Sequence, residues 1–109
     1  MLARFLAGMG MSVHYVVRDD GEVLAREFPE AVAHGSLEGL LPVVDCVVLA
    51  CPYNAETHHL LDFETFRIMR TGVRIVNIAR GKCVNEEALV DALERGIVGG
   101  AGLDVYENE

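Results

Sequence analysis

The sequence has 109 residues, 51% of them hydrophobic, and a formal net charge of −8. That length allows one domain or part of one, and that hydrophobic fraction excludes a disordered chain. The nine Lys and Arg residues form no cluster, which argues against nucleic acid or an anionic membrane surface as a partner.

No apolar run approaches the roughly 20 residues that span a bilayer, and residues 1–10 lack the basic start and cleavage site of a signal peptide. We therefore expect a cytoplasmic protein. Cys46, Cys51 and Cys83 show neither CxxC nor zinc-ligand spacing. We expect each to be a small buried hydrophobe, and we expect no metal site.

The first part of the sequence predicts short elements. Its apolar spacing, β-branched runs and Pro29 indicate a helix over residues 2–9, a strand over 12–17, a weak helix over 22–28, an edge strand over 31–33 and a short helix capped by Ser36.

The remaining sequence alternates strands and helices more regularly. We predict a buried strand over 46–50, a loop over 53–59, a helix over 63–70 capped by Asp62, a strand within 72–81, a helix capped by Asn85 and ending at Arg95-Gly96, and a glycine-rich strand over 99–105. This alternation predicts a doubly wound parallel sheet, Rossmann-like, in a three-layer α/β/α arrangement without a second domain.

Charged residues follow the predicted strands where ligands collect in such sheets. One apolar run ends in Asn77 and Arg80, and Asp104 and Glu109 come at or after the end of the last strand. The Arg80 guanidinium can bind a carboxylate through two parallel hydrogen bonds, so a site for a nucleotide and a small acid is one interpretation. Alternatively, Arg80 forms a surface salt bridge, Asp104 caps a turn and Glu109 is solvated.

Histidine and cysteine offer weaker candidates for chemistry. His14 lies in a predicted strand, where we expect a packed or hydrogen-bonded ring, and His58 and His59 are expected at the surface. The Cys51-Pro52 backbone could line a cofactor or merely end a strand. A nucleophilic Cys51 would need a neighbouring base, and the sequence indicates none.

The sequence resembles the nucleotide-binding domain of the NAD(P)-dependent D-isomer-specific 2-hydroxyacid dehydrogenases, a family with D-lactate, phosphoglycerate, glyoxylate/hydroxypyruvate and formate dehydrogenases. The resemblance covers nearly the whole chain, and the segments from Cys51 onward are highly specific in combination. The segments that carry it are Gly10-Met11, Ser36–Asp45, Cys51–Thr57, Val76–Gly81, Asn85–Leu89 and Gly102–Glu109.

The resemblance implies a role for particular residues. Arg80 is expected to bind the substrate carboxylate and polarise the carbonyl, and Glu109 to hydrogen-bond a catalytic histidine and raise its pKa. Asp104 is expected to meet the nicotinamide. The implied cofactor-lining positions are Cys51, Pro52, Thr57, Ile78 and Ala79.

Two departures from the family pattern stand out. The glycine-rich phosphate loop and first strand should precede Met1, and the histidine and the split substrate domain are absent, so residues 1–109 are expected to be a partial NAD(P)-binding domain. In the strand order 3-2-1-4-5-6, loss of strand 1 divides the sheet into two parts. The acid that usually binds ribose is replaced by Val17-Arg18; Asp19 or Asp20 could substitute for it, or Arg18 could bind the 2′-phosphate of NADP, so NAD and NADP both remain open.

The resemblance therefore implies an oxidoreductase that transfers hydride between NAD(P) and a small 2-oxo or 2-hydroxy acid, in a homodimeric parent protein. The alternative is a nucleotide-sensing, corepressor-like binding protein of the same fold. Arg80 and Glu109 do not discriminate between these functions, because such binding proteins keep both residues.

Overall fold

The computed structural model describes residues 8–17, 26–27 and 29–104. Its contacts divide the chain into two compact units, Met1–Leu40 and Leu41–Glu109. The helices predicted over residues 2–9 and 22–28 lie mostly outside the described residues, although positions 8, 26 and 27 are helical.

The first unit contains a parallel pair of short strands, β1 (His14–Val16) and β2 (Val32–His34), followed by helix α3 (Leu37–Leu40). The Ser36 hydroxyl accepts a hydrogen bond from the Gly39 N–H at 3.1 Å, as expected of an N-cap. The strands at 12–17 and 31–33 and the capped helix are thus confirmed, with β1 shorter than predicted.

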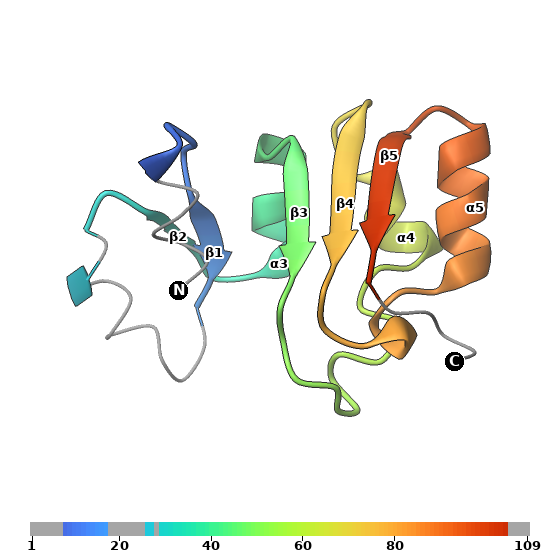
Figure 1. The fold of residues 1–109 in the computed structure, drawn as a ribbon, viewed down its shortest axis with the longest axis horizontal. Helices are drawn as coiled ribbons and strands as arrows, with labels where there is room; N and C mark the ends of the chain where they lie inside the picture. The colour runs from blue at the N-terminus through green and yellow to red at the C-terminus, as the bar shows by residue number, and fades with distance from the viewer. Residues whose placement is uncertain (1–7, 18–25, 28, 105–109) are drawn as a thin grey trace. The chain divides into compact units, whose positions relative to one another are not determined.

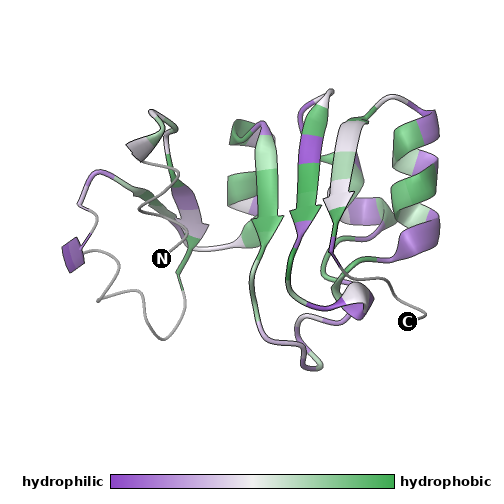
Figure 2. Cartoon of the chain, viewed as in Figure 1, coloured by the Kyte–Doolittle hydropathy of each residue, from purple (hydrophilic) through white to green (hydrophobic). Residues whose placement is uncertain are grey.

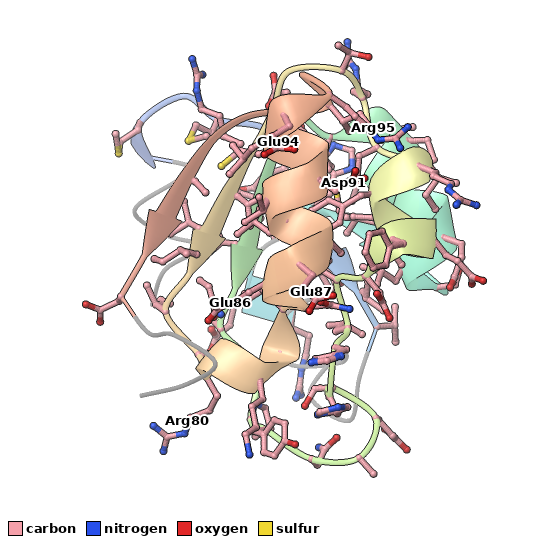
Figure 3. All side chains as sticks on the ribbon, turned by 90° about the vertical axis from the view of Figure 1, so that its right-hand side faces the viewer. Arg80, Glu86, Glu87, Asp91, Glu94 and Arg95 are labelled. Carbon is pink, nitrogen blue, oxygen red and sulfur yellow. The ribbon has the colours of Figure 1, made fainter. Side chains whose placement is uncertain are left out.

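The second unit is built on a three-stranded parallel sheet in the order β3-β4-β5, and Figure 1 shows all three arrowheads pointing the same way. Helices α4 and α5 lie on the same face of this sheet (Figures 1 and 3). This arrangement confirms the predicted Rossmann-like parallel α/β fold. The elements are η1 (Leu41–Val43), β3 (Cys46–Leu49), α4 (Phe63–Arg67), β4 (Val73–Asn77), η2 (Gly81–Cys83), α5 (Glu86–Glu94) and β5 (Val98–Leu103).

The core of the second unit lies between the sheet and its two helices. Alternate residues of β4, Val73, Ile75 and Asn77, are buried, and β3 alternates in the same way. Figure 2 shows β3 and β4 as mainly hydrophobic and β5 as pale, because β5 consists largely of glycine and alanine. Apolar burial of this kind supplies the main driving force for folding.

Both helices of the second unit begin at the predicted caps. Asp62 accepts a hydrogen bond from the Phe63 N–H at 2.8 Å, and Asn85 accepts from the N–H groups of Glu87 and Ala88. Helix α4 was predicted to reach residue 70 but ends at Arg67. Its last turn tightens, since the Ile68 and Met69 N–H groups bond to carbonyls three residues back.

One glycine of β5 permits a close approach of two backbones. The register between β4 and β5 shifts so that Val73 faces Val98 and Arg74 faces Gly100, leaving Gly99 as an extra residue. A Cβ atom on Gly99 would lie 2.7 Å from the Gly72 carbonyl oxygen. A side chain at this bulge would therefore force the two backbones apart.

The described strands form two separate hydrogen-bonded sheets. Strand β1 pairs with β2 in one sheet, and β3, β4 and β5 pair in the other. No described helix is both long enough and apolar enough to cross a membrane.

Candidate functional site at the strand ends

The carboxyl ends of β3, β4 and β5 lie at one edge of the sheet, because the strands are parallel. A loop of residues 50–60 follows β3, a tight turn of residues 78–80 follows β4, and Asp104 follows β5. Most of the predicted site residues fall in these three connections. They are therefore presented where α/β proteins commonly bind their ligands.

Asn77 organises the turn after β4. Its side chain is 1% exposed, its Nδ2 donates to the Arg80 carbonyl at 2.9 Å, and its Oδ1 accepts from the Ala79 N–H at 2.9 Å. Its own carbonyl accepts from the Asp104 N–H at 3.1 Å. One buried residue thus holds the backbone at both Arg80 and Asp104.

Arg80 is exposed and extends away from α5, as Figure 3 shows. Its backbone is extended, with φ −136° and ψ 146°, and it immediately precedes η2. Within the described residues its guanidinium forms no ion pair, so the structure shows none of the surface salt bridges that the alternative interpretation requires. All donors of its planar fork are available to an anionic ligand.

The loop after β3 is closed by Thr57, which is 3% exposed. Its hydroxyl donates to the Pro52 carbonyl and accepts from the Asn54 N–H, both at 2.8 Å. The side chain of Thr57 is therefore turned into the loop, while Pro52 lies at the surface. Any effect of the Thr57 hydroxyl on a bound cofactor would act through the shape of this loop.

The loop after β3 is also bonded to the segment after β4. The His59 N–H donates to the Lys82 carbonyl at 2.8 Å, and the Leu61 N–H donates to the Cys83 carbonyl at 3.1 Å. His59 has φ +46°, a left-handed conformation that costs energy for a residue other than glycine. These bonds hold the two connections together at the carboxyl edge of the sheet.

The remaining predicted cofactor positions differ in exposure. Ile78 is 49% exposed, Ala79 and Cys51 are half-buried, and Asp104 is exposed. These residues come from the three neighbouring strand ends, as expected. Arg18 and Glu109 lie outside the described residues.

The histidines behave broadly as expected. His14 Nδ1 and His34 Nε2 are 2.9 Å apart in a hydrogen bond across β1 and β2, and His58 is exposed. His59 is half-buried rather than exposed, and its backbone N–H is bonded to the segment after β4. Tyr53 Oη lies 2.9 Å from His58 Nδ1, and the rings of His58 and His59 stack.

The expectation for the cysteines was only partly right. Cys83 is buried, but Cys46 and Cys51 are half-exposed. Cys46 alternates with the buried Val47, so its side chain projects from the opposite, less covered face of the sheet. Partial burial is the larger cause, and the nearby Asp45 carboxylate the smaller one, that raises the pKa of the Cys46 thiol. A raised pKa disfavours a reactive thiolate.

Asn77 is the residue whose part in the site the sequence did not reveal. The signal was a polar residue at a position where the alternation of β4 requires a buried side chain. Buried amides need hydrogen-bond partners, and at a strand end those partners lie in the following turn.

A hollow of about 150 Å³ between α4 and α5 is lined by other residues, including Phe63, Arg67 and Asp91, and contains none of the predicted site positions.

A parallel α/β sheet that presents an arginine, an acid and an ordered loop at its carboxyl edge belongs to the class of nucleotide-binding α/β domains. A family model described as "D-isomer specific 2-hydroxyacid dehydrogenase, NAD binding domain" matches residues 1–109. The chain belongs to this family.

Similar proteins agree with this assignment. The chain is 43% identical over 108 residues to a glyoxylate reductase of Thermococcus kodakarensis, covering 99% of this chain and 32% of that protein. A D-lactate dehydrogenase from Aquifex aeolicus, solved with NAD and lactic acid, gives a TM-score of 0.83 and 35% identity, over 98% of this chain and 31% of that one.

A glyoxylate/hydroxypyruvate reductase from Sinorhizobium meliloti, solved with NADP and malonate, gives a TM-score of 0.87 and 34% identity. The match covers 99% of this chain and 32% of that one. The chain thus spans about a third of the length of these relatives.

Proposed function

We propose that the protein to which this chain belongs reduces a small 2-oxo acid, or oxidises the corresponding 2-hydroxy acid, with NAD or NADP. The observation that carries this proposal is Arg80, an exposed arginine without an ion pair among the described residues, held at the carboxyl edge of a parallel sheet. A 2-oxo acid offers such a residue a planar carboxylate for bidentate hydrogen bonding.

The proposed roles of the chain's residues follow from this placement. Arg80 binds the substrate carboxylate and, through its remaining donors, polarises the carbonyl to be reduced. The half-buried Ala79 and the surface at Pro52 and Ile78 line the cofactor, and Asp104 meets its nicotinamide end. When bound, the nicotinamide supplies the hydride. Glu109 is proposed to raise the pKa of a histidine that exchanges a proton with the substrate oxygen.

A corepressor-like function of the same fold is the less favoured alternative. The relatives described above are named as a dehydrogenase and reductases. Their names favour an enzyme for this chain as well, although Arg80 alone does not distinguish the two functions.

The organisation of the whole protein is part of the proposal. We propose that residues 1–109 are part of an NAD(P)-binding domain and that the substrate domain belongs to the rest of a longer, homodimeric protein. A cytoplasmic location likewise remains a prediction. The length of the relatives supports a longer protein, since this chain matches about a third of each.

The proposal is tested by Arg80→Lys in the full-length protein, with steady-state kinetics on glyoxylate, pyruvate and hydroxypyruvate. Lysine keeps the charge but loses the fork, so we expect a loss of about 2–4 kcal/mol of transition-state stabilisation in kcat/KM. Arg70→Lys, at an exposed position of the same unit, is the matched control and should leave kcat/KM unchanged. An unchanged kcat/KM in Arg80→Lys would remove Arg80 from the site.

Cofactor preference is tested at Arg18. If Arg18 binds the 2′-phosphate of NADP, Arg18→Ala should weaken NADPH binding far more than NADH binding, because a charge-assisted hydrogen bond is lost. Titration calorimetry with both nucleotides measures the difference. An equal loss of affinity for both nucleotides would show that Arg18 does not bind the 2′-phosphate.

A further inference from the structure

We infer that Asn77 is a positioning residue that sets the geometry of Arg80. The inference rests on the proposed function of Arg80 but adds a residue that acts without touching the substrate. It starts from the two hydrogen bonds that the Asn77 side chain makes to the turn after β4, one to the Arg80 carbonyl and one to the Ala79 N–H.

Asn77 occupies a buried position in an otherwise apolar row of β4, where packing alone does not require an amide. Asn77 is on the same face of β4 as Val73 and Ile75, and all three are at most 1% exposed. A leucine of similar size would satisfy the packing of this apolar row. The amide therefore has another role, and its polar atoms point to the turn that carries Arg80.

Asn77 is not the only partner of the Arg80 carbonyl. The same oxygen also accepts from the Cys83 N–H at 3.1 Å, so the bond from Asn77 is a second one to it. A fixed side chain, unlike water, restricts the turn to one conformation. The Asn77 side chain bonds two consecutive residues at once, which fixes the direction in which Arg80 leaves the sheet.

The backbone of Asn77 extends this control to the next strand end. The Asp104 N–H donates to the Asn77 carbonyl at 3.1 Å. This bond does not depend on the identity of the side chain, so substitution of Asn77 should disturb Arg80 while leaving Asp104 in place. Asp104 thus provides a reference within the same molecule, against which a change at Arg80 can be measured.

Kinetics of the full-length enzyme test the inference through a double-mutant cycle. Asn77→Leu should lower kcat/KM for 2-oxo acids by about tenfold to a hundredfold, since misplacing a catalytic group by about 1 Å has an effect of that order. In an Arg80→Ala background the same substitution should have little further effect, because a positioning residue has nothing left to position. Equal fold-losses in both backgrounds would overturn the inference.

Asn85→Leu is the matched control. Asn85 is also an asparagine that caps backbone N–H groups in the second unit, and its side chain bonds to Asp62, Glu87 and Ala88, not to the turn. It should lower stability without a comparable loss in kcat/KM, and any loss should be the same with and without Arg80. If Asn85→Leu reproduces the behaviour of Asn77→Leu, the effect is one of stability.

Hydrogen exchange provides a readout that does not depend on activity. In Asn77→Leu the Ala79 amide should lose its protection, while the Asp104 amide should keep it. Asn77→Asp preserves the acceptor for Ala79 but, while its carboxyl is ionised, has no donor for Arg80, so at a pH where it is ionised it should protect Ala79 again and still impair kcat/KM. Retained protection of Ala79 in Asn77→Leu would contradict the inference even if the enzyme proved inactive on 2-oxo acids.

Discussion

The turns after β3 and β4 are each held by a buried polar side chain, but the two side chains bond to different parts of the backbone. Among the described residues, Thr57 and Asn77 are the two buried polar side chains, and each closes one of these turns through hydrogen bonds to the backbone. Thr57 bonds to the backbone of its own loop, and its side chain is buried. Asn77 bonds to the backbone of Arg80, whose side chain is exposed.

This difference shows that residues singled out by the same family resemblance need not share one role. Thr57 and Arg80 both lie in segments that resemble the dehydrogenases, yet Thr57 is 3% exposed and Arg80 is exposed. Thr57 can influence a cofactor only by shaping the loop that holds Pro52. Arg80 is the residue proposed to contact the substrate directly. We therefore expect substitution of Thr57 mainly to lower stability, and substitution of Asn77 mainly to lower activity.

The largest effect on stability is expected for Thr57→Val. Valine has nearly the same shape but cannot make the bonds to the Pro52 carbonyl and the Asn54 N–H. At about 0.5–1.5 kcal/mol for each lost bond, the free energy of unfolding should fall by about 1–3 kcal/mol. Urea denaturation of the full-length protein measures this loss. Thr71→Val, at an exposed position, is the control and should change the free energy of unfolding by less than about 0.5 kcal/mol.

The same variant sharpens the contrast with Asn77. Thr57→Val should raise KM for the nucleotide only a few-fold, because the loop loosens but loses no ligand contact. Asn77→Leu should have the greater effect on kcat/KM and the smaller effect on stability. If Thr57→Val instead abolished activity while the protein stayed folded, Thr57 would have to contact the cofactor directly, and the contrast between the turns would fail.

Much of the fold was predictable because it depends on local patterns. The apolar runs marked β3 and β4, and Asn85 and Asp62 marked the helix starts. The positions of Arg80 and Asp104 at one edge followed from parallel strands. The strands and the helix starts are specified by residues close together in the sequence.

The rest depends on contacts that no local pattern specifies. The sequence placed Thr57 among the residues lining the cofactor, but burial of its hydroxyl depends on how the whole loop closes. Cys46 and Cys51 were expected to be buried, yet both lie on less covered parts of the sheet and its edge. Asn77 was seen as the end of an apolar run, and its two bonds appear only once the turn is folded.

The smallest expected effect concerns the link between the segments that follow the two turns. Asn85 Nδ2 donates to Asp62 Oδ1 at 3.0 Å, so the N-cap of α5 is bonded to the N-cap of α4. Asp62→Ala and Asn85→Ala should each cost about 1 kcal/mol as lost caps. Their sum should exceed the cost of the double variant by about 0.5–1 kcal/mol, since either change alone already breaks the shared bond.

A matched pair separates this coupling from the loss of caps in general. Ser36→Ala removes the cap of α3 and shares no hydrogen-bond partner with Asp62. The combination of Ser36→Ala with Asp62→Ala should therefore be additive within about 0.5 kcal/mol in the same denaturation measurement. Additivity of the Asp62 and Asn85 variants as well would mean that the cap-to-cap bond contributes nothing. Backbone bonds such as that from His59 to Lys82 would still join the two segments.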